Sequence, residues 1–285
     1  MPGSPFTALP RLGVGLSTEP GSAAQGHLDA RAFDVAHPGL VHFLEYGADV
    51  ERGLDDHVRG WAGAGRPTTY HFLDVNLEDP DDLDAAWVAR TREHARAIGA
   101  AWLCGDAGLW HVGPRDRGHQ LLLPPILTDD SARAVGDSVR ALAEATGLVV
   151  LPENPPGDAY VGPLHVLDYF ARVAERSGGG LLLDCAHLAI FQRLRGHDPL
   201  TALDGFPLDR VIELHVAGGV EVDVDGLALV DDAHVAEPLP DTWAIFDAVV
   251  ARAPNLRAIV YECERNPPDD VLAGFRRLND AFPAR

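Results

Sequence analysis

The sequence predicts an α/β fold, a (β/α)8 or TIM barrel in a single domain, and three observations lead to it. The chain has 285 residues, close to the roughly 250 that such a barrel needs. Short apolar runs rich in β-branched residues alternate with helical patterns, and no stretch has the composition of a linker. Several runs end in a carboxylate or an imidazole, which is typical of barrels because the strand ends gather in one pocket.

Eight apolar runs are the candidate strands. They are nearly continuous rather than alternating, as expected of parallel strands that are buried on both faces. In chain order they cover residues 12–17, 40–47, 67–75, 101–106, 147–153, 180–185, 211–217 and 257–263. The GxG in the first run has no third glycine and no helix start after it, so we discard a dinucleotide-binding motif.

Helical patterns connect these runs. Residues 79–100 begin with acids, which suit a helix N-terminus, and end near Gly99. Similar patterns cover 129–147, 162–179 and 239–254. Two longer insertions, at about 107–128 and 218–238, follow the fourth and seventh strands, on the face where a barrel carries its active site. The stretch EVDVDGLALV in the second insertion predicts a hairpin that turns at Asp225-Gly226.

Composition limits the function. The formal charge of −20 argues against nucleic-acid binding, and no apolar run reaches the roughly 18 residues of a membrane helix. The three cysteines have no paired spacing and no secretory signal is recognisable, so we expect a reducing, cytoplasmic setting. The chain has no lysine, which excludes a Schiff-base lysine, a pyridoxal phosphate anchor and a P-loop lysine.

The acids and histidines at the strand ends are the candidate site. They are Glu45, His71, Asp106, Glu153, Asp184, His187, His215 and Glu262, joined by Asp232 and His234 from the loop after strand seven. Such a mixture of imidazoles and carboxylates suits iron, manganese or zinc. Converging carboxylates repel each other unless cations are present, so the set predicts two or more metal ions. Glu153 or Glu262 would be the natural shared ligand.

Each candidate also has a structural interpretation. A strand-end acid such as Asp184 can cap the following helix, and His71 can be a hydrogen-bonded core histidine. Asp232 and His234 lie in an expected loop, where acids and histidines are common. The whole set therefore supports a metal site better than any one member does.

These motifs resemble the multinuclear non-haem iron-dependent oxidative enzymes, the family that includes the methanobactin biosynthesis oxidase. The resemblance covers most of the chain and rests on LPENPP, LLLDCAH, GHDPL, FPLDRVIELHVAGG, DDAH before PLPDTW, and YECE. It implies a TIM barrel with two or three iron ions and O₂ as co-substrate. The implied substrate is a ribosomally made precursor peptide or a related small molecule, often delivered by a small partner protein.

The resemblance also implies roles by position. The central, catalytic iron site would consist of Glu153, Asp184, His215 and Glu262; His71, with Asp106, would hold a neighbouring ion, and His187, Asp232 and His234 a further one. The chain departs from the family at three positions. Ala107 replaces a histidine, His187 stands where many members have asparagine, and Gly219 replaces a second histidine. Asp106 would then have to compensate for the loss at position 107.

Two other functions remain open at this point. One is a zinc- or manganese-dependent isomerase or hydrolase of the xylose-isomerase-like kind, without redox change. Sugar isomerases of this shape usually place lysines in the pocket, and this chain has none. The other is a metal-free binding module, which nothing in the sequence favours. Metal identity and oxygen dependence separate these alternatives.

Overall fold

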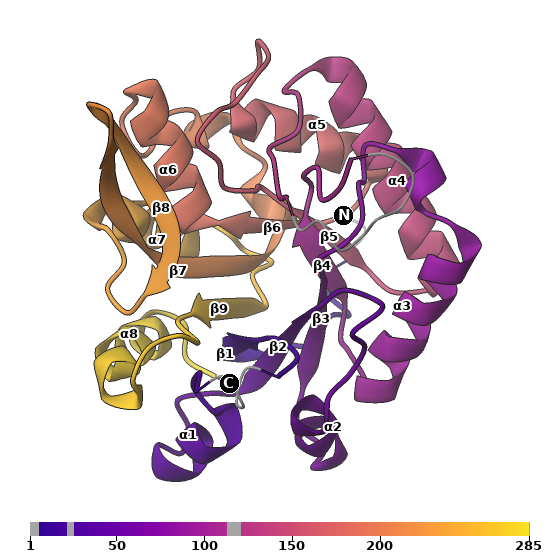
Figure 1. The fold of residues 1–285 in the computed structure, drawn as a ribbon, viewed down its shortest axis with the longest axis vertical. Coiled ribbons are helices and arrows are strands. Elements are labelled where there is room, and N and C mark those ends of the chain that lie inside the picture. The colour runs from indigo at the N-terminus through magenta and orange to yellow at the C-terminus, as the bar shows by residue number, and fades with distance from the viewer. Residues whose placement is uncertain (1–5, 22–25, 113–120, 285) are drawn as a thin grey trace.

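A closed barrel of parallel strands forms the centre of the protein (Figure 1). The computed structural model describes residues 6–21, 26–112 and 121–284. The barrel strands are β1 (Gly13–Thr18), β2 (Phe43–Ala48), β3 (Thr68–Phe72), β4 (Leu103–Asp106), β5 (Val150–Glu153), β6 (Leu181–Asp184), β7 (Val211–Val224) and β9 (Ala258–Glu262). Strands adjacent in sequence pair in parallel from β1 to β7, and β9 closes the ring by pairing with both β7 and β1. The predicted TIM barrel is confirmed.

Helices surround the barrel, as Figure 1 shows. They are α1 (Ala30–Ala36), α2 (Asp56–Gly63), α3 (Ala85–Ile98), α4 (Asp129–Thr146), α5 (Val166–Ser177), α6 (Cys185–Arg195), α7 (Pro240–Val250) and α8 (Pro268–Ala281). The helix expected over 79–100 is confirmed but shorter, because the Asp84 side chain caps α3 after a 3₁₀ turn at Pro80–Asp82. The helix expected over 162–179 begins only at Val166, since the His165 side chain accepts the N–H of Leu167 as its cap. Within the described part of the chain, no helix has the length and apolarity to cross a membrane.

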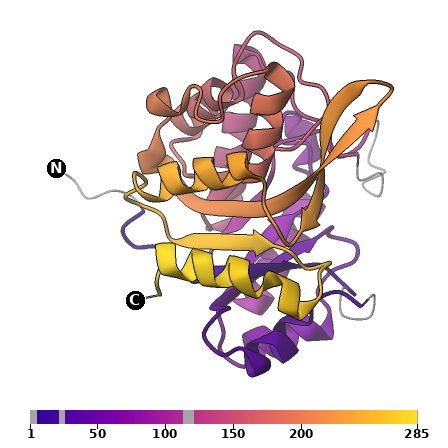
Figure 2. The ribbon, with the colours of Figure 1, turned by 90° about the vertical axis from the view of Figure 1, so that its left-hand side faces the viewer.

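The long strand β7 continues beyond the barrel and returns as β8 (Leu227–Val235), which pairs with it antiparallel. Asp225 and Gly226 connect the two strands with φ values of 54° and 84°, the positive values that a tight hairpin turn requires. The predicted hairpin is therefore present, and Figure 2 shows it projecting from one end of the barrel. Asp232 and His234 were expected in a loop; instead they lie on strand β8.

A mostly apolar layer, which also contains Thr69 and Glu213, fills the barrel below the strand ends. Side chains two residues apart on a strand point to the same side, so the residue two positions before each strand-end acid also faces the interior. On four strands that residue is fully or almost fully buried and apolar: Phe43, Leu151, Leu182 and Val260. The barrel is therefore packed with side chains below the site, and the polar layer can be approached only from the carboxyl ends of the strands.

Candidate metal centre

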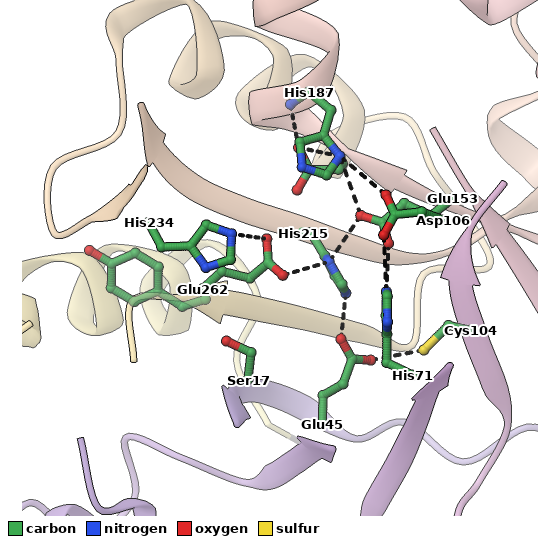
Figure 3. Close-up of polar contacts among 12 residues, drawn as sticks. Ser17, Glu45, His71, Cys104, Asp106, Glu153, His187, His215, His234 and Glu262 are labelled. Atoms are coloured by element: carbon green, nitrogen blue, oxygen red, sulfur yellow. Dashed lines mark hydrogen bonds and ion pairs between the residues drawn. The ribbon is translucent and has the colours of Figure 1, made fainter. Parts of the chain in front are cut away.

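Seven barrel strands each contribute one acid or histidine to a common layer at their carboxyl ends. They are Glu45, His71, Asp106, Glu153, Asp184, His215 and Glu262. The strand register brings several of them to the same height, since Asp106 pairs with Glu153 and Asp184 pairs with His215 across neighbouring strands. Figure 3 shows most of these side chains pointing toward one another in the barrel mouth.

A first group contains His71, Asp106 and Glu153, whose potential ligand atoms all lie within 4.8 Å of one another. His71 Nε2 is 2.8 Å from Glu153 Oε2 and 3.9 Å from Asp106 Oδ2. Ala107 is buried, and its backbone N–H donates to the carbonyl oxygen of Glu153. Position 107 therefore offers no side-chain ligand here.

A second group contains Asp184, His215 and Glu262, again with potential ligand atoms within 4.8 Å. His215 is fully buried, and its Nδ1 lies 3.2 Å from Glu153 Oε1 and 3.3 Å from Glu262 Oε1. Glu153 thus directs one oxygen to each group, as expected of a shared ligand. Asp184 caps α6, because its Oδ1 accepts the N–H of His187, while its Oδ2 has no hydrogen bond within the described residues.

A third group lies nearer the hairpin and contains His187, Asp232, His234 and one oxygen of Glu262. Asp232 Oδ2 is 3.0 Å from His187 Nε2 and 3.4 Å from His234 Nε2. Glu262 Oε2 is 3.7 Å from His234 Nε2, so Glu262 connects the second and third groups as Glu153 connects the first and second. All nine predicted metal ligands therefore converge at the barrel mouth.

The chemistry of these atoms fits a metal ion. Buried polar atoms are normally hydrogen-bonded, and each exception needs an explanation. Seven buried atoms of the site make no well-aligned hydrogen bond within the described part of the chain, although His215 lies at ion-pair distance from Glu45 and Glu153: Asp106 Oδ1, Glu153 Oε1, Asp184 Oδ2, both ring nitrogens of His215, Asp232 Oδ1 and Glu262 Oε2. They are carboxylate oxygens and imidazole nitrogens, the donor set that suits iron, manganese or zinc.

The charges in the site cannot all be present without compensation. Burial, together with the charge of Glu153, raises the pKa of Asp106 to about 8, and burial raises the pKa of Asp184 to about 7. Burial by itself would raise the pKa of Glu153, but His215 and His71 beside it hold that pKa well below its ordinary value. The metal-free protein thus compensates its carboxylates with protons and imidazolium groups, which cations could replace.

A cavity of about 310 Å³ opens onto these groups. Besides site residues, it is lined by Ser17 at the end of β1 and Glu19 just after it, by Trp110 and Leu122 from the insertion after β4, and by Arg265 after β9. Residues 113–120 of that insertion lie outside the described residues. The cavity is large enough for a side chain and a short piece of backbone.

Sequence reasoning assigned no role to two buried carboxylates of the site. Glu45 was a strand-end candidate without a metal role; its Oε1 lies 2.9 Å from His215 Nε2, and its Oε2 accepts from Thr69 and Cys104. Glu264 was not considered. It lies two residues beyond Glu262 and contacts His234 at 3.0 Å. The motif YECERN looks like a strand end entering a polar loop, so only the burial of Glu264 reveals its place.

The closed parallel barrel, with a layer of histidines and carboxylates at the carboxyl ends of its strands, defines the class of the protein as a TIM barrel. Similar solved structures include the TTHB071 protein from Thermus thermophilus soaked with ZnCl₂, at 20% identity and a TM-score of 0.57, with 94% of this chain and 98% of that chain covered. Another is a xylose isomerase domain containing protein from Salmonella typhimurium, at 13% identity and a TM-score of 0.57, covering 96% and 98%. Likeness at these identities shows the fold alone.

More particularly, the chain belongs to the family described as RiPP precursor modification enzyme MbnB/TglH/ChrH, which matches residues 35–277. A RiPP is a ribosomally synthesised and post-translationally modified peptide, so the family implies a precursor peptide as substrate. Relatives include a UPF0276 protein of Caulobacter vibrioides, 27% identical over 252 residues, covering 85% of this chain and 87% of that protein. A UPF0276 protein of Acaryochloris marina is 24% identical over 283 residues, covering 97% and 96%.

Proposed function

We propose that the protein is a multinuclear iron-dependent oxidoreductase that uses O₂ to modify a ribosomally made precursor peptide. The observation that carries the proposal is the convergence of nine imidazole and carboxylate ligands, with two glutamates each directed at two groups. Family membership supports the substrate class. Bound iron would supply the redox chemistry that oxidation by O₂ needs.

The residues of each group would hold one ion. Glu153, Asp184, His215 and Glu262 would form the central, catalytic position; His71 and Asp106 would complete a neighbouring one with Glu153. His187, Asp232 and His234 would complete a third with Glu262. Glu153 and Glu262 would each contribute one oxygen to two adjacent positions.

The remaining side chains of the cavity would bind and orient the peptide. Trp110 and Leu122 offer apolar surface that limits water at the reacting group. A cavity of about 310 Å³ admits one residue of an extended chain better than a folded partner. A small partner protein that presents the peptide to the barrel mouth would fit this geometry.

The test is co-production of the chain with the peptide encoded by a short open reading frame beside its gene, followed by mass spectrometry of the peptide. We expect a mass change that requires both iron and O₂ and disappears in the Glu153→Gln variant. The exposed Asp231→Asn substitution on β8 removes the same charge outside the site and should leave the change intact. A modification that proceeds equally without O₂, or with zinc as the only metal, would refute the proposal.

A further inference from the structure

The backbone of His234 is held in an unusual conformation. Its φ is 52°, in the left-handed region that residues other than glycine seldom occupy. The side chain of Asn266 donates a hydrogen bond of 2.6 Å to the carbonyl oxygen of His234 and another, of 3.0 Å, to that of Cys263. The segment after β9 therefore fixes the main chain of β8 at His234. A residue in a sparsely populated backbone conformation keeps it only where the surrounding structure holds it in place.

The segment after β9 also holds the ring of His234, through Glu264. Its Nδ1 lies 3.0 Å from Oε1 and 3.2 Å from Oε2 of Glu264, a carboxylate that is only 4% exposed. Ser17 at the end of β1 donates a hydrogen bond of 3.0 Å to Glu264 Oε2. The hydrogen bond from β1 thus anchors Glu264, so the position of Glu264 does not depend on His234 alone.

This contact determines which nitrogen faces the site. Nδ1 is occupied by Glu264, so Nε2 points toward Asp232 Oδ2 at 3.4 Å and Glu262 Oε2 at 3.7 Å. A histidine that binds a metal through one nitrogen usually donates its other N–H to a carboxylate, which fixes the ring and strengthens the ligand. Glu264 has the place and geometry of such a supporting carboxylate.

We propose that Glu264 is a positioning residue that holds His234 with Nε2 directed at a divalent metal ion in the third group. Asn266 assists by fixing the backbone of His234 in its left-handed conformation. The inference rests on the proposed function in one respect, because it takes the third group as a metal position. Glu264 itself lies behind the ring, on the side away from Asp232.

The test is an anaerobic titration with iron(II), read out as iron ions bound per chain, the dissociation constant of the weakest ion and the Mössbauer spectrum. His234→Ala should bind one ion fewer than the wild type. Glu264→Leu should weaken that ion by about 10- to 100-fold, the usual effect of losing a supporting partner. Glu264→Gln should weaken it less, because the amide oxygen can still accept from Nδ1–H. Asp231→Asn is the matched control, and thermal unfolding of each metal-free variant verifies its fold.

The outcomes separate this inference from the proposed function. If both Glu264 variants bind every ion as tightly as the wild type while His234→Ala loses one, Glu264 does not position the ring. If Glu264→Gln loses the ion as completely as His234→Ala, Glu264 is itself a ligand, and the positioning role is also overturned. If His234→Ala retains all ions, the third group is not a metal position, although the other two could still hold iron. Failure of the wild type to take up iron would instead contradict the proposed function.

Discussion

The substitution Glu153→Gln preserves the shape of the side chain but removes the charge at the centre of the site. Glu153 is almost fully buried, with Oε2 at 2.8 Å from His71 and Oε1 at 3.2 Å from His215 and 3.6 Å from His187. Removing one partner of a buried ion pair leaves the other charge uncompensated, which typically costs about 3 to 5 kcal/mol. We expect a loss of this size in the free energy of unfolding of the metal-free protein at pH 7. In the loaded protein, two ions should be weakened, because each oxygen of Glu153 serves a different group.

Two assays measure these effects. Urea unfolding of the metal-free wild type and variant gives the difference in stability, and plasma mass spectrometry after anaerobic iron loading and desalting gives the ions per chain. Asp231→Asn, on the exposed surface of β8, controls for the change in net charge. If Glu153→Gln unfolds within about 1 kcal/mol of the wild type and retains the full number of ions, the assignment of Glu153 as a shared ligand is wrong.

Four further predictions concern pH, the buried layer and the hairpin. Burial raises the pKa of Asp106 to about 8 and that of Asp184 to about 7, so both carboxyls must release protons to bind metal. Metal affinity, measured by calorimetry, should therefore rise from pH 6 to 8. An affinity that does not change with pH would contradict this. The same raised pKa values make the metal-free protein less stable as pH rises from about 4 to 8, since the folded chain binds these protons more tightly than the unfolded one. Trp102→Phe removes the 2.7 Å hydrogen bond from Nε1 to the buried Glu213 and should lower the free energy of unfolding in urea by about 1 to 3 kcal/mol. Glu213→Gln should lower it less at pH 7, because burial raises the pKa of this carboxyl to about 8. Equal losses in the two variants would refute the argument. Gly226→Ala should destabilise the hairpin by about 1 kcal/mol because φ is 84° there, while the iron content stays unchanged; a lost ion would show that the turn controls the site.

The barrel could be predicted because its strands carry a strong local signal. Residues such as Val150 and Leu151 are buried by helices on one side and the barrel interior on the other, so the runs are apolar throughout. Helix starts were less certain, since they depend on caps. A strand expected to include Cys185 ends one residue earlier because the Asp184 side chain caps α6 at that point.

The site was predictable where strands end and less so where tertiary packing decides. Six of the nine predicted ligands meet because parallel strands of one barrel bring their carboxyl ends together; His187 reaches the site from α6, and Asp232 and His234 from β8. The place of Asp232 and His234 depends on the register of the β7–β8 hairpin, which the sequence does not specify beyond its turn. Glu264 could not be distinguished from an ordinary loop acid, because its burial results from contacts with Ser17 and His234, far from it in the chain.

The most direct test of the central claim is the metal content of the protein after anaerobic loading with iron-57, combined with Mössbauer spectroscopy. The proposed sharing of Glu153 and Glu262 between adjacent groups would place ions side by side, so we predict two or more irons per chain with exchange-coupled spectra in the partly oxidised protein. A single zinc or manganese ion, with no uptake of iron, would contradict the multinuclear iron centre. That result would instead favour a non-redox isomerase or hydrolase on the same barrel.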